Sequence, residues 1–240
     1  MRCEENWYEE EFGLEEDFEG ESENEEDEEV NEEEDDEEDY EAVGWDAITE
    51  CFEKIYPGQE NPIHYGTLIS WQLGGNDPLD GISVYDGGEY WHFVTYGLSE
   101  LYEKETEDKE VSGYGMEFTF KLKKSSEDDT ARIRGICGIL QQIARITFTE
   151  GEIFGTYEYL YTGQTSGIDP EGKSNITGFI TIPDTDAKPI DTPNGKLEFV
   201  EFIGVTDAEL KAIQDKSYNV EKLYKELGSD VTSYDRESLV

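Results

Sequence analysis

The segment WHFVTYGLSELYEKE, from Trp91 to Glu105, contains residue types that can act as a nucleophile and a base. A histidine that takes the proton of a serine hydroxyl is the core of many acyl-transfer sites, and His92 and Ser99 are the candidates here. Such a pair needs a third group that orients the imidazole, and the nucleophile-elbow pattern Gly-x-Ser-x-Gly does not occur in the chain. Tight glycine turns and a place in a sheet explain both residues, so the sequence favours a structural role.

The sequence contains no pattern for a metal ion or a nucleotide cofactor. Two histidines, His64 and His92, and the lack of a Cys-x-x-Cys pair do not predict a zinc site. The P-loop pattern is absent, and Gly113-Tyr-Gly115 is not continued into Gly-x-Gly-x-x-Gly. We therefore predict neither a cofactor nor enzymatic activity. A deep pocket that places a histidine beside a carboxylate with a displaced pKa would instead favour an enzyme of unfamiliar type.

Charge is distributed unevenly along the 240 residues, which carry a formal net charge of −43. Residues 1–41 contain 25 acidic residues and one basic residue. Such a composition buries too little apolar surface to offset the entropy of ordering, so we predict a disordered acidic arm over 1–40 and a folded domain over 41–240. Apolar residues among the glutamates of the arm are typical of segments that associate with basic partners: Trp7, Tyr8, Phe12, Leu14 and Phe18.

The charge also limits the class of partner. Proteins hold nucleic acids mainly by neutralising phosphates with Lys and Arg, so a chain with 61 acidic and 18 basic residues is not expected to bind them. It is expected to attract basic proteins by electrostatic steering, and its carboxylates can occupy the sites where such a partner would bind phosphates.

The sequence predicts no membrane span and no secretion signal. Three widely spaced cysteines fit free thiols, and we expect a cytoplasmic protein.

Periodicity predicts an α+β (mixed α/β) domain, with helices flanking a mostly antiparallel or mixed central sheet. Helices are expected over 45–55 and 129–147, after the capping box Thr206-x-x-Glu209, and over 219–228. A strand is expected to start at 64 and to run into a Gly-Gly turn at 74–75. Further strands are expected in a hairpin of 81–85 with 90–96, and at 116–122, 153–160, 178–182 and 197–205. Strict alternation over 116–122 predicts a half-buried strand whose Glu117, Thr119 and Lys121 face away from the core.

Long blocks of the domain resemble the Suppressor of fused family, and they follow the family's order over almost all of 41–240. The blocks are HYGTLISWQLGGNDPLDGISVY, WHFVTYGLSELYEKE, SGYGMEFTFKL, DTPNGKLEFVEFIGVTDAEL and SDVTSYDRESLV, while 148–183 shows little of the resemblance. The chain looks closer to the shorter bacterial members, many of which are similar to immunity proteins that neutralise toxins, often nucleases. The resemblance implies a domain without catalytic activity that binds other proteins.

The resemblance also implies where a partner binds. In the animal family member, which restrains transcription factors, the partner peptide adds as a strand beside the segment that follows a tyrosine matching Tyr102. The following loop, 103–111, departs from the animal pattern in length and charge. We predict partner contacts at Tyr102, Glu103, Glu105, Asp108 and Glu110.

Two hypotheses remain open for the function of such a domain. The first is an immunity or antitoxin protein that neutralises a basic toxin, for example a nuclease, by direct binding. The second is a regulatory scaffold that sequesters a transcription factor or another protein by strand addition. A neighbouring toxin gene would favour the first, and recovery of a regulator would favour the second.

Overall fold

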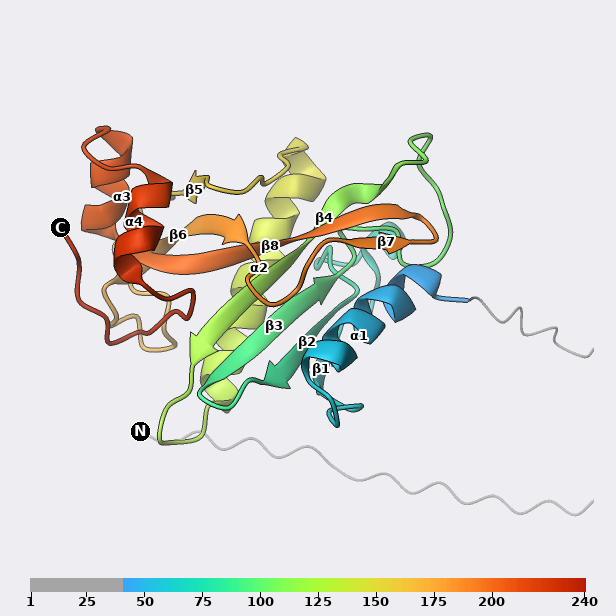
Figure 1. The fold of residues 1–240 in the computed structure, drawn as a ribbon, viewed down its shortest axis with the longest axis horizontal. Helices are drawn as coiled ribbons and strands as arrows, with labels where there is room; N and C mark the ends of the chain where they lie inside the picture. The colour runs from blue at the N-terminus through green and yellow to red at the C-terminus, as the bar shows by residue number, and fades with distance from the viewer. Residues whose placement is uncertain (1–40) are drawn as a thin grey trace, which may run out of the picture. The chain divides into compact units, whose positions relative to one another are not determined.

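The computed structural model describes residues 41–240, and the predicted acidic arm over 1–40 lies outside them. An eight-stranded sheet has the order β1-β2-β3-β4-β8-β6-β5, with β7 paired to β8 off this path (Figure 1). β4 and β8 are parallel, and the other pairs of named strands are antiparallel. The elements are α1 (Val43–Ile55), β1 (Ile63–Gly66), the 3-10 turn η1 (Trp71–Leu73), β2 (Gly81–Asp86), β3 (Tyr90–Tyr96), β4 (Val111–Lys123), α2 (Thr130–Glu150), β5 (Tyr159–Leu160), β6 (Ile176–Pro183), β7 (Ile190–Thr192), β8 (Gly195–Thr206), α3 (Asp207–Gln214) and α4 (Val220–Leu227).

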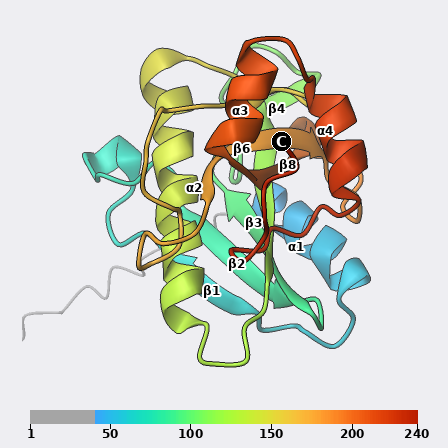
Figure 2. The ribbon, with the colours of Figure 1, turned by 90° about the vertical axis from the view of Figure 1, so that its left-hand side faces the viewer.

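Helices cover both faces of the sheet, as Figures 1 and 2 show. α1 packs Ile48 and Phe52 into a buried cluster with side chains of β2, β3 and β8. α2 packs its apolar stripe on the opposite face, against a cluster that includes Phe118 and Phe202. α3 and α4 share a third cluster with Ile203 of β8. Since neighbouring residues of a strand point to opposite faces, Phe202 and Ile203 place α3 and α4 on the face that α1 covers.

The structure confirms the predicted α+β class and most of the expected elements. Both hydrogen bonds of the Thr206–Glu209 capping box are formed, and Asn219 caps α4. Two expected strands are much shorter than predicted. The segment 64–75 leaves the sheet after Gly66 and forms the turn η1, and only Tyr159 and Leu160 of 153–160 pair with another strand. Among the described residues no helix has the length and apolar character needed to cross a membrane.

The prediction that β4 is half-buried is wrong. Glu117, Thr119 and Lys121 are as buried as the apolar residues that alternate with them. Alternation of polar and apolar residues normally marks a strand with one solvated face. Here β4 is a central strand with helices over both faces, so the ionisable groups of Glu117 and Lys121 must find partners inside the protein.

Lys121 finds these partners in a network of carboxylates from β8, from the turn after β6 and from the C-terminal segment. Its Nζ lies 2.6 Å from Asp230 Oδ2, 2.8 Å from Asp186 Oδ2 and 3.4 Å from Glu201 Oε2. It also lies 3.9 Å from Asp184 Oδ1. Although burial opposes the charged form, Glu201, Asp184 and the other carboxylates raise the pKa of Lys121 above its ordinary value. The network therefore joins β4 and β8 to the turn after β6 and to the C-terminal segment.

Candidate functional site

The five residues predicted to contact a partner lie in one loop between β3 and β4. Tyr102 is 46% exposed, and Glu103, Glu105, Asp108 and Glu110 are all exposed. Residues 103–110, the acidic loop, contain five acidic and two basic residues and belong to no strand or helix. The structure therefore presents a dense group of carboxylates to solvent immediately after an exposed tyrosine.

Glu117 fixes the turn that leads from β3 into this loop. Its Oε1 accepts hydrogen bonds from the backbone N–H groups of Gly97, Leu98 and Ser99 at 2.9–3.1 Å, and from Ser99 Oγ at 2.7 Å. Its Oε2 is 2.5 Å from Thr95 Oγ1. Burial raises the pKa of Glu117 to about 7, although these hydrogen bonds act in the opposite direction. A single buried carboxyl thus satisfies three consecutive backbone donors and sets the path of the chain toward Tyr102.

Glu100 anchors the acidic loop from within. Its carboxylate accepts from Lys104 Nζ at 2.6 Å and from the backbone N–H groups of Glu105, Thr106 and Gly113 at 2.6–3.1 Å. Burial of Glu100 acts against ionisation, but the hydrogen bonds prevail and lower its pKa to about 2. The loop is therefore closed around an ionised carboxylate, and Lys104 is used internally rather than offered to a partner.

We expect Glu100→Gln to loosen the acidic loop without unfolding the domain. The substitution removes the charge that pairs with Lys104 and weakens the bonds from Glu105 and Thr106, because charge-assisted hydrogen bonds are about twice as strong as neutral ones. Hydrogen exchange of the Glu105 and Thr106 amides should become at least about tenfold faster. Glu103→Gln, which changes an exposed neighbour, is the control, and equal exchange in the two variants would contradict the anchoring role.

A groove of about 390 Å³ runs beside Tyr102. Its lining includes Tyr102, Glu103 and Glu105. Trp71 and Phe148 also line it, and their rings pack edge to face with centroids 5.9 Å apart. Asp108 and Glu110 lie outside this lining: Asp108 Oδ1 instead accepts from the Glu110 N–H at 2.9 Å. The structure thus brings together three of the five predicted contacts in the groove and leaves two at its margin.

Most of the groove lining was not predicted from the sequence, including Asp80, Trp71 and Phe148. Burial raises the pKa of Asp80, and burial together with the Asp80 charge raises the pKa of Tyr102, which therefore keeps its phenolic proton at neutral pH. Asp80 and Trp71 lie in a block that carries the family resemblance, but they are more than 20 positions from Tyr102. Only the fold brings them to the groove.

The structure separates the two residues of the catalytic interpretation. Ser99 Oγ donates to Glu117, whereas His92 lies between Tyr56 Oη at 2.7 Å and Asp184 Oδ2 at 2.9 Å. The His92 side chain is completely buried, so it offers no face to a substrate. Both residues therefore hold the fold together. Among residues 41–240 no group of three or more His, Cys, Asp or Glu side chains is arranged to hold a metal ion.

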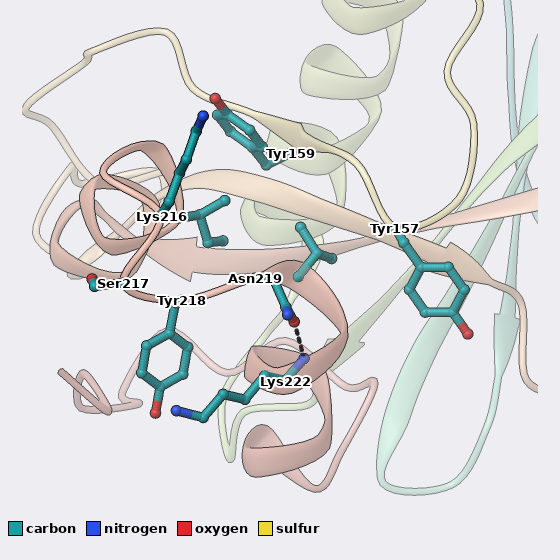
Figure 3. Close-up of a pocket in the computed structure, with 9 residues that line it drawn as sticks. Tyr157, Tyr159, Lys216, Ser217, Tyr218, Asn219 and Lys222 are labelled. Atoms are coloured by element: carbon teal, nitrogen blue, oxygen red, sulfur yellow. Dashed lines mark hydrogen bonds between the residues drawn. The ribbon is translucent and has the colours of Figure 1, made fainter.

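A second hollow, of about 420 Å³, lies between β5 and the α3–α4 connection (Figure 3). Tyr157, Tyr159, Lys216 and Lys222 contribute to its lining, and no carboxylate does. Lys222 Nζ is 4.0 Å from the centre of the Tyr218 ring and 3.8 Å from Glu226 Oε1, so its charge is already engaged. None of the predicted contact residues lies here.

The fold and the groove define an α+β domain with an anchored acidic loop on its surface. Residues 75–237 match the model of a family described as Suppressor of fused protein (SUFU), and the chain belongs to this family. It is 30% identical over 178 residues to the human Suppressor of fused homolog, an alignment that covers 69% of this chain and 36% of the human protein. The chain thus spans about a third of the length of the curated relative it matches.

Solved structures agree with this assignment. The protein in the Sufu–Fu complex is 28% identical, with a TM-score of 0.70 over 82% of this chain and 91% of that one. The putative SUFU homolog from Neisseria gonorrhoeae is 14% identical, with a TM-score of 0.52 over 82% of this chain and 97% of that one, and shows the shared fold alone. The family predicted from the sequence blocks is confirmed.

Proposed function

We propose that this chain is a non-catalytic protein-binding domain that holds a basic segment of a partner protein at Tyr102 and the acidic loop. The observation that carries the proposal is that some acidic residues of this region are turned inward and hold the backbone, while others are exposed to solvent. Glu100 and Glu117 point inward and fix the backbone, whereas Glu103, Glu105 and Glu110 are exposed. A carboxylate surface on an anchored backbone loses little conformational freedom when a partner binds.

The partner is expected to be basic because of the charge of the whole chain. A net charge of −43 attracts cationic proteins over distances of about a Debye length, roughly 8–10 Å at physiological salt, and raises their association rate. Tyr102, which directly precedes the acidic loop, supplies a large contact surface and a phenolic hydrogen-bond donor. The partner segment that fits best presents Lys or Arg to the acidic loop and packs an apolar group against Tyr102 and Trp71.

In the first setting, the domain is an immunity or antitoxin protein that neutralises a basic toxin. A nuclease is a suitable target, because carboxylates of the acidic loop can occupy the positions where the phosphates of the nucleic-acid substrate would bind to the nuclease. The test is co-expression of the chain with the toxin encoded by an adjacent gene. Cells should survive only when the acidic loop is intact, and toxicity that the chain never relieves would exclude this setting.

The second setting, a scaffold that sequesters a regulator, is supported by the likeness to the protein of the Sufu–Fu complex. Strand addition is the expected binding mode there, since residues 103–110 are outside the sheet and a partner strand can pair with them. Isotope-edited infrared or NMR spectra of the complex should then show new strand structure over 103–110. Recovery of a regulatory protein, together with the absence of an adjacent toxin gene, would favour this setting.

Deletion of residues 1–40 is expected to slow association with a basic partner and to flatten its salt dependence. The deletion removes 24 acidic residues and one basic residue, which is more than half of the net charge. Stopped-flow association rates at 50 and 300 mM NaCl measure both effects, and the thermal midpoint of the truncated chain should stay unchanged. Equal rates and salt slopes for the two chains would show that the arm has no part in binding.

A further inference from the structure

Residues 61–76, NPIHYGTLISWQLGGN, form the longest stretch of the chain without Asp, Glu, Lys or Arg. One third of all residues in the chain are charged, so 16 consecutive uncharged residues are unusual here. They form β1, which is an edge of the sheet, and the loop that contains η1. Natural edge strands are commonly protected by charged residues, and this one is not.

Three large apolar side chains of this loop point into solvent. Leu68 is fully exposed, Leu73 is 81% exposed and Ile69 is 57% exposed; we call these three residues the apolar ridge. The loop is held by hydrogen bonds from the Leu73 and Gly75 N–H groups to Ser70 O, both at 3.0 Å. The exposure of the ridge is therefore a feature of an ordered turn, and no helix or strand within 41–240 buries these three side chains.

A hollow of about 630 Å³ is lined by residues of β1, of the loop after it and of α2, and two of the three ridge residues belong to this lining. Figure 2 shows the ribbons of β1 and α2 next to each other. Tyr65, Cys137 and Gly138 contribute to the lining of the hollow. Its only charged residues, Asp77 and Arg145, form an ion pair at 3.3 Å, so the hollow has no net charge. An apolar ridge and an uncharged hollow in one patch suit an isologous contact, in which the same surface of each copy faces the other across a two-fold axis.

The backbone of β1 adds a second element of self-complementarity. The Thr67 N–H donates to Asp80 O at 2.9 Å, on the β2 side of the strand. Since backbone groups of an antiparallel strand alternate between its two sides, the N–H and C=O groups of His64 and Gly66 point to the open edge. Two copies of β1 related by a two-fold axis can pair through these groups in antiparallel fashion.

We propose that β1, the apolar ridge and the adjacent hollow form a contact between two copies of this chain. A second copy can approach here although the chain carries a charge of −43, because the only carboxylate of the patch, Asp77, is paired with Arg145 and the open edge of β1 can pair with its own copy. The association is weak at low salt and becomes stronger as salt screens the remaining repulsion. Binding of a basic partner has the opposite salt dependence, so the two interactions are distinguishable.

The test is sedimentation velocity of the full 240-residue chain over 5–500 µM at 50 and 500 mM NaCl. We expect the dimer dissociation constant to fall at least fivefold between the two salt concentrations. Leu73→Asp and Leu68→Asp should each raise it at least tenfold at 500 mM NaCl. Ile153→Asp is the control, since Ile153 is 60% exposed and lies outside the patch, and it should leave the constant unchanged.

Two results would overturn the proposal. One is a chain that stays monomeric at every concentration and salt, and the other is a dimer whose dissociation constant changes less than twofold in both leucine variants. Circular dichroism of each variant verifies that the domain is folded, which is expected because the substituted side chains are exposed. Neither result affects the proposed binding of a basic partner.

Discussion

Glu117→Leu is expected to lower the free energy of unfolding by at least about 3 kcal/mol, because a buried donor that loses its acceptor costs about 1–3 kcal/mol. Leucine removes the acceptor of three backbone N–H groups, those of Gly97, Leu98 and Ser99. Urea denaturation at pH 6 measures the change. The damage should be concentrated in the turn before Tyr102, so exchange of these three amides should rise more than that of the β6 amides.

Glu117→Gln is the matched control, since its carbonyl oxygen can still accept from the same three donors. It also tests the protonation of Glu117. The folded protein, with a pKa of about 7, binds this proton more tightly than the unfolded chain, with a pKa of 4.5. The stabilising contribution is therefore complete below pH 4.5 and is lost as the pH rises through 7. Relative to the glutamine variant, the wild type should lose roughly 3 kcal/mol between pH 4.5 and 8. A difference independent of pH would contradict a raised pKa.

Lys121→Met is expected to lower the free energy of unfolding by about 3–5 kcal/mol, the usual cost of removing one partner from a buried ion pair. Asp184 and Asp230 would lose the cation that balances them, and the pKa of both carboxyls, now below its ordinary value, would rise. Asp230 belongs to the C-terminal segment, where Thr232 also bonds to the Lys121 backbone at 2.8 Å. Limited proteolysis should therefore cleave residues 229–240 first.

The control for this substitution is Lys123→Met, two positions further along the same strand. The Lys123 side chain is exposed, and surface changes of this kind usually alter stability by less than about 0.5 kcal/mol. Equal stability of the two methionine variants would contradict the role of the network around Lys121.

The two networks also show what sequence periodicity cannot predict. Local patterns identified the capping box at Thr206, the hairpin of β2 and β3, and the exposed, charged nature of the acidic loop, because each depends on neighbouring residues. The burial of Glu117 and Lys121 depends on partners far away in sequence: Lys121 meets Asp230 109 positions later. The charged residues of β4 were therefore predicted to face solvent, whereas in the fold they are buried and paired with distant residues.

The same limit applies to the site. Tyr102 and the acidic loop were predicted from the family resemblance and from composition. The sequence does not distinguish the glutamates of this region that face inward from those that are exposed. Glu100 lies two positions before Tyr102 and is turned inward, whereas Glu103 is exposed. What separates them is a set of backbone donors that converge on Glu100 only when the loop is closed. Asp80 and Trp71 are at the groove because the loop after β1 packs beside it.

The most direct test of the central claim is calorimetric binding of the full chain to the basic protein encoded by the adjacent gene. The loop variant carries Glu103→Gln, Glu105→Gln, Asp108→Asn and Glu110→Gln. The control variant has the same change in charge at exposed positions elsewhere: Glu53→Gln, Glu60→Gln, Glu221→Gln and Glu237→Gln. We predict that the loop variant binds at least tenfold more weakly and with a smaller salt slope, while the control changes less than threefold. Equal affinities of the two variants would contradict binding at Tyr102 and the acidic loop.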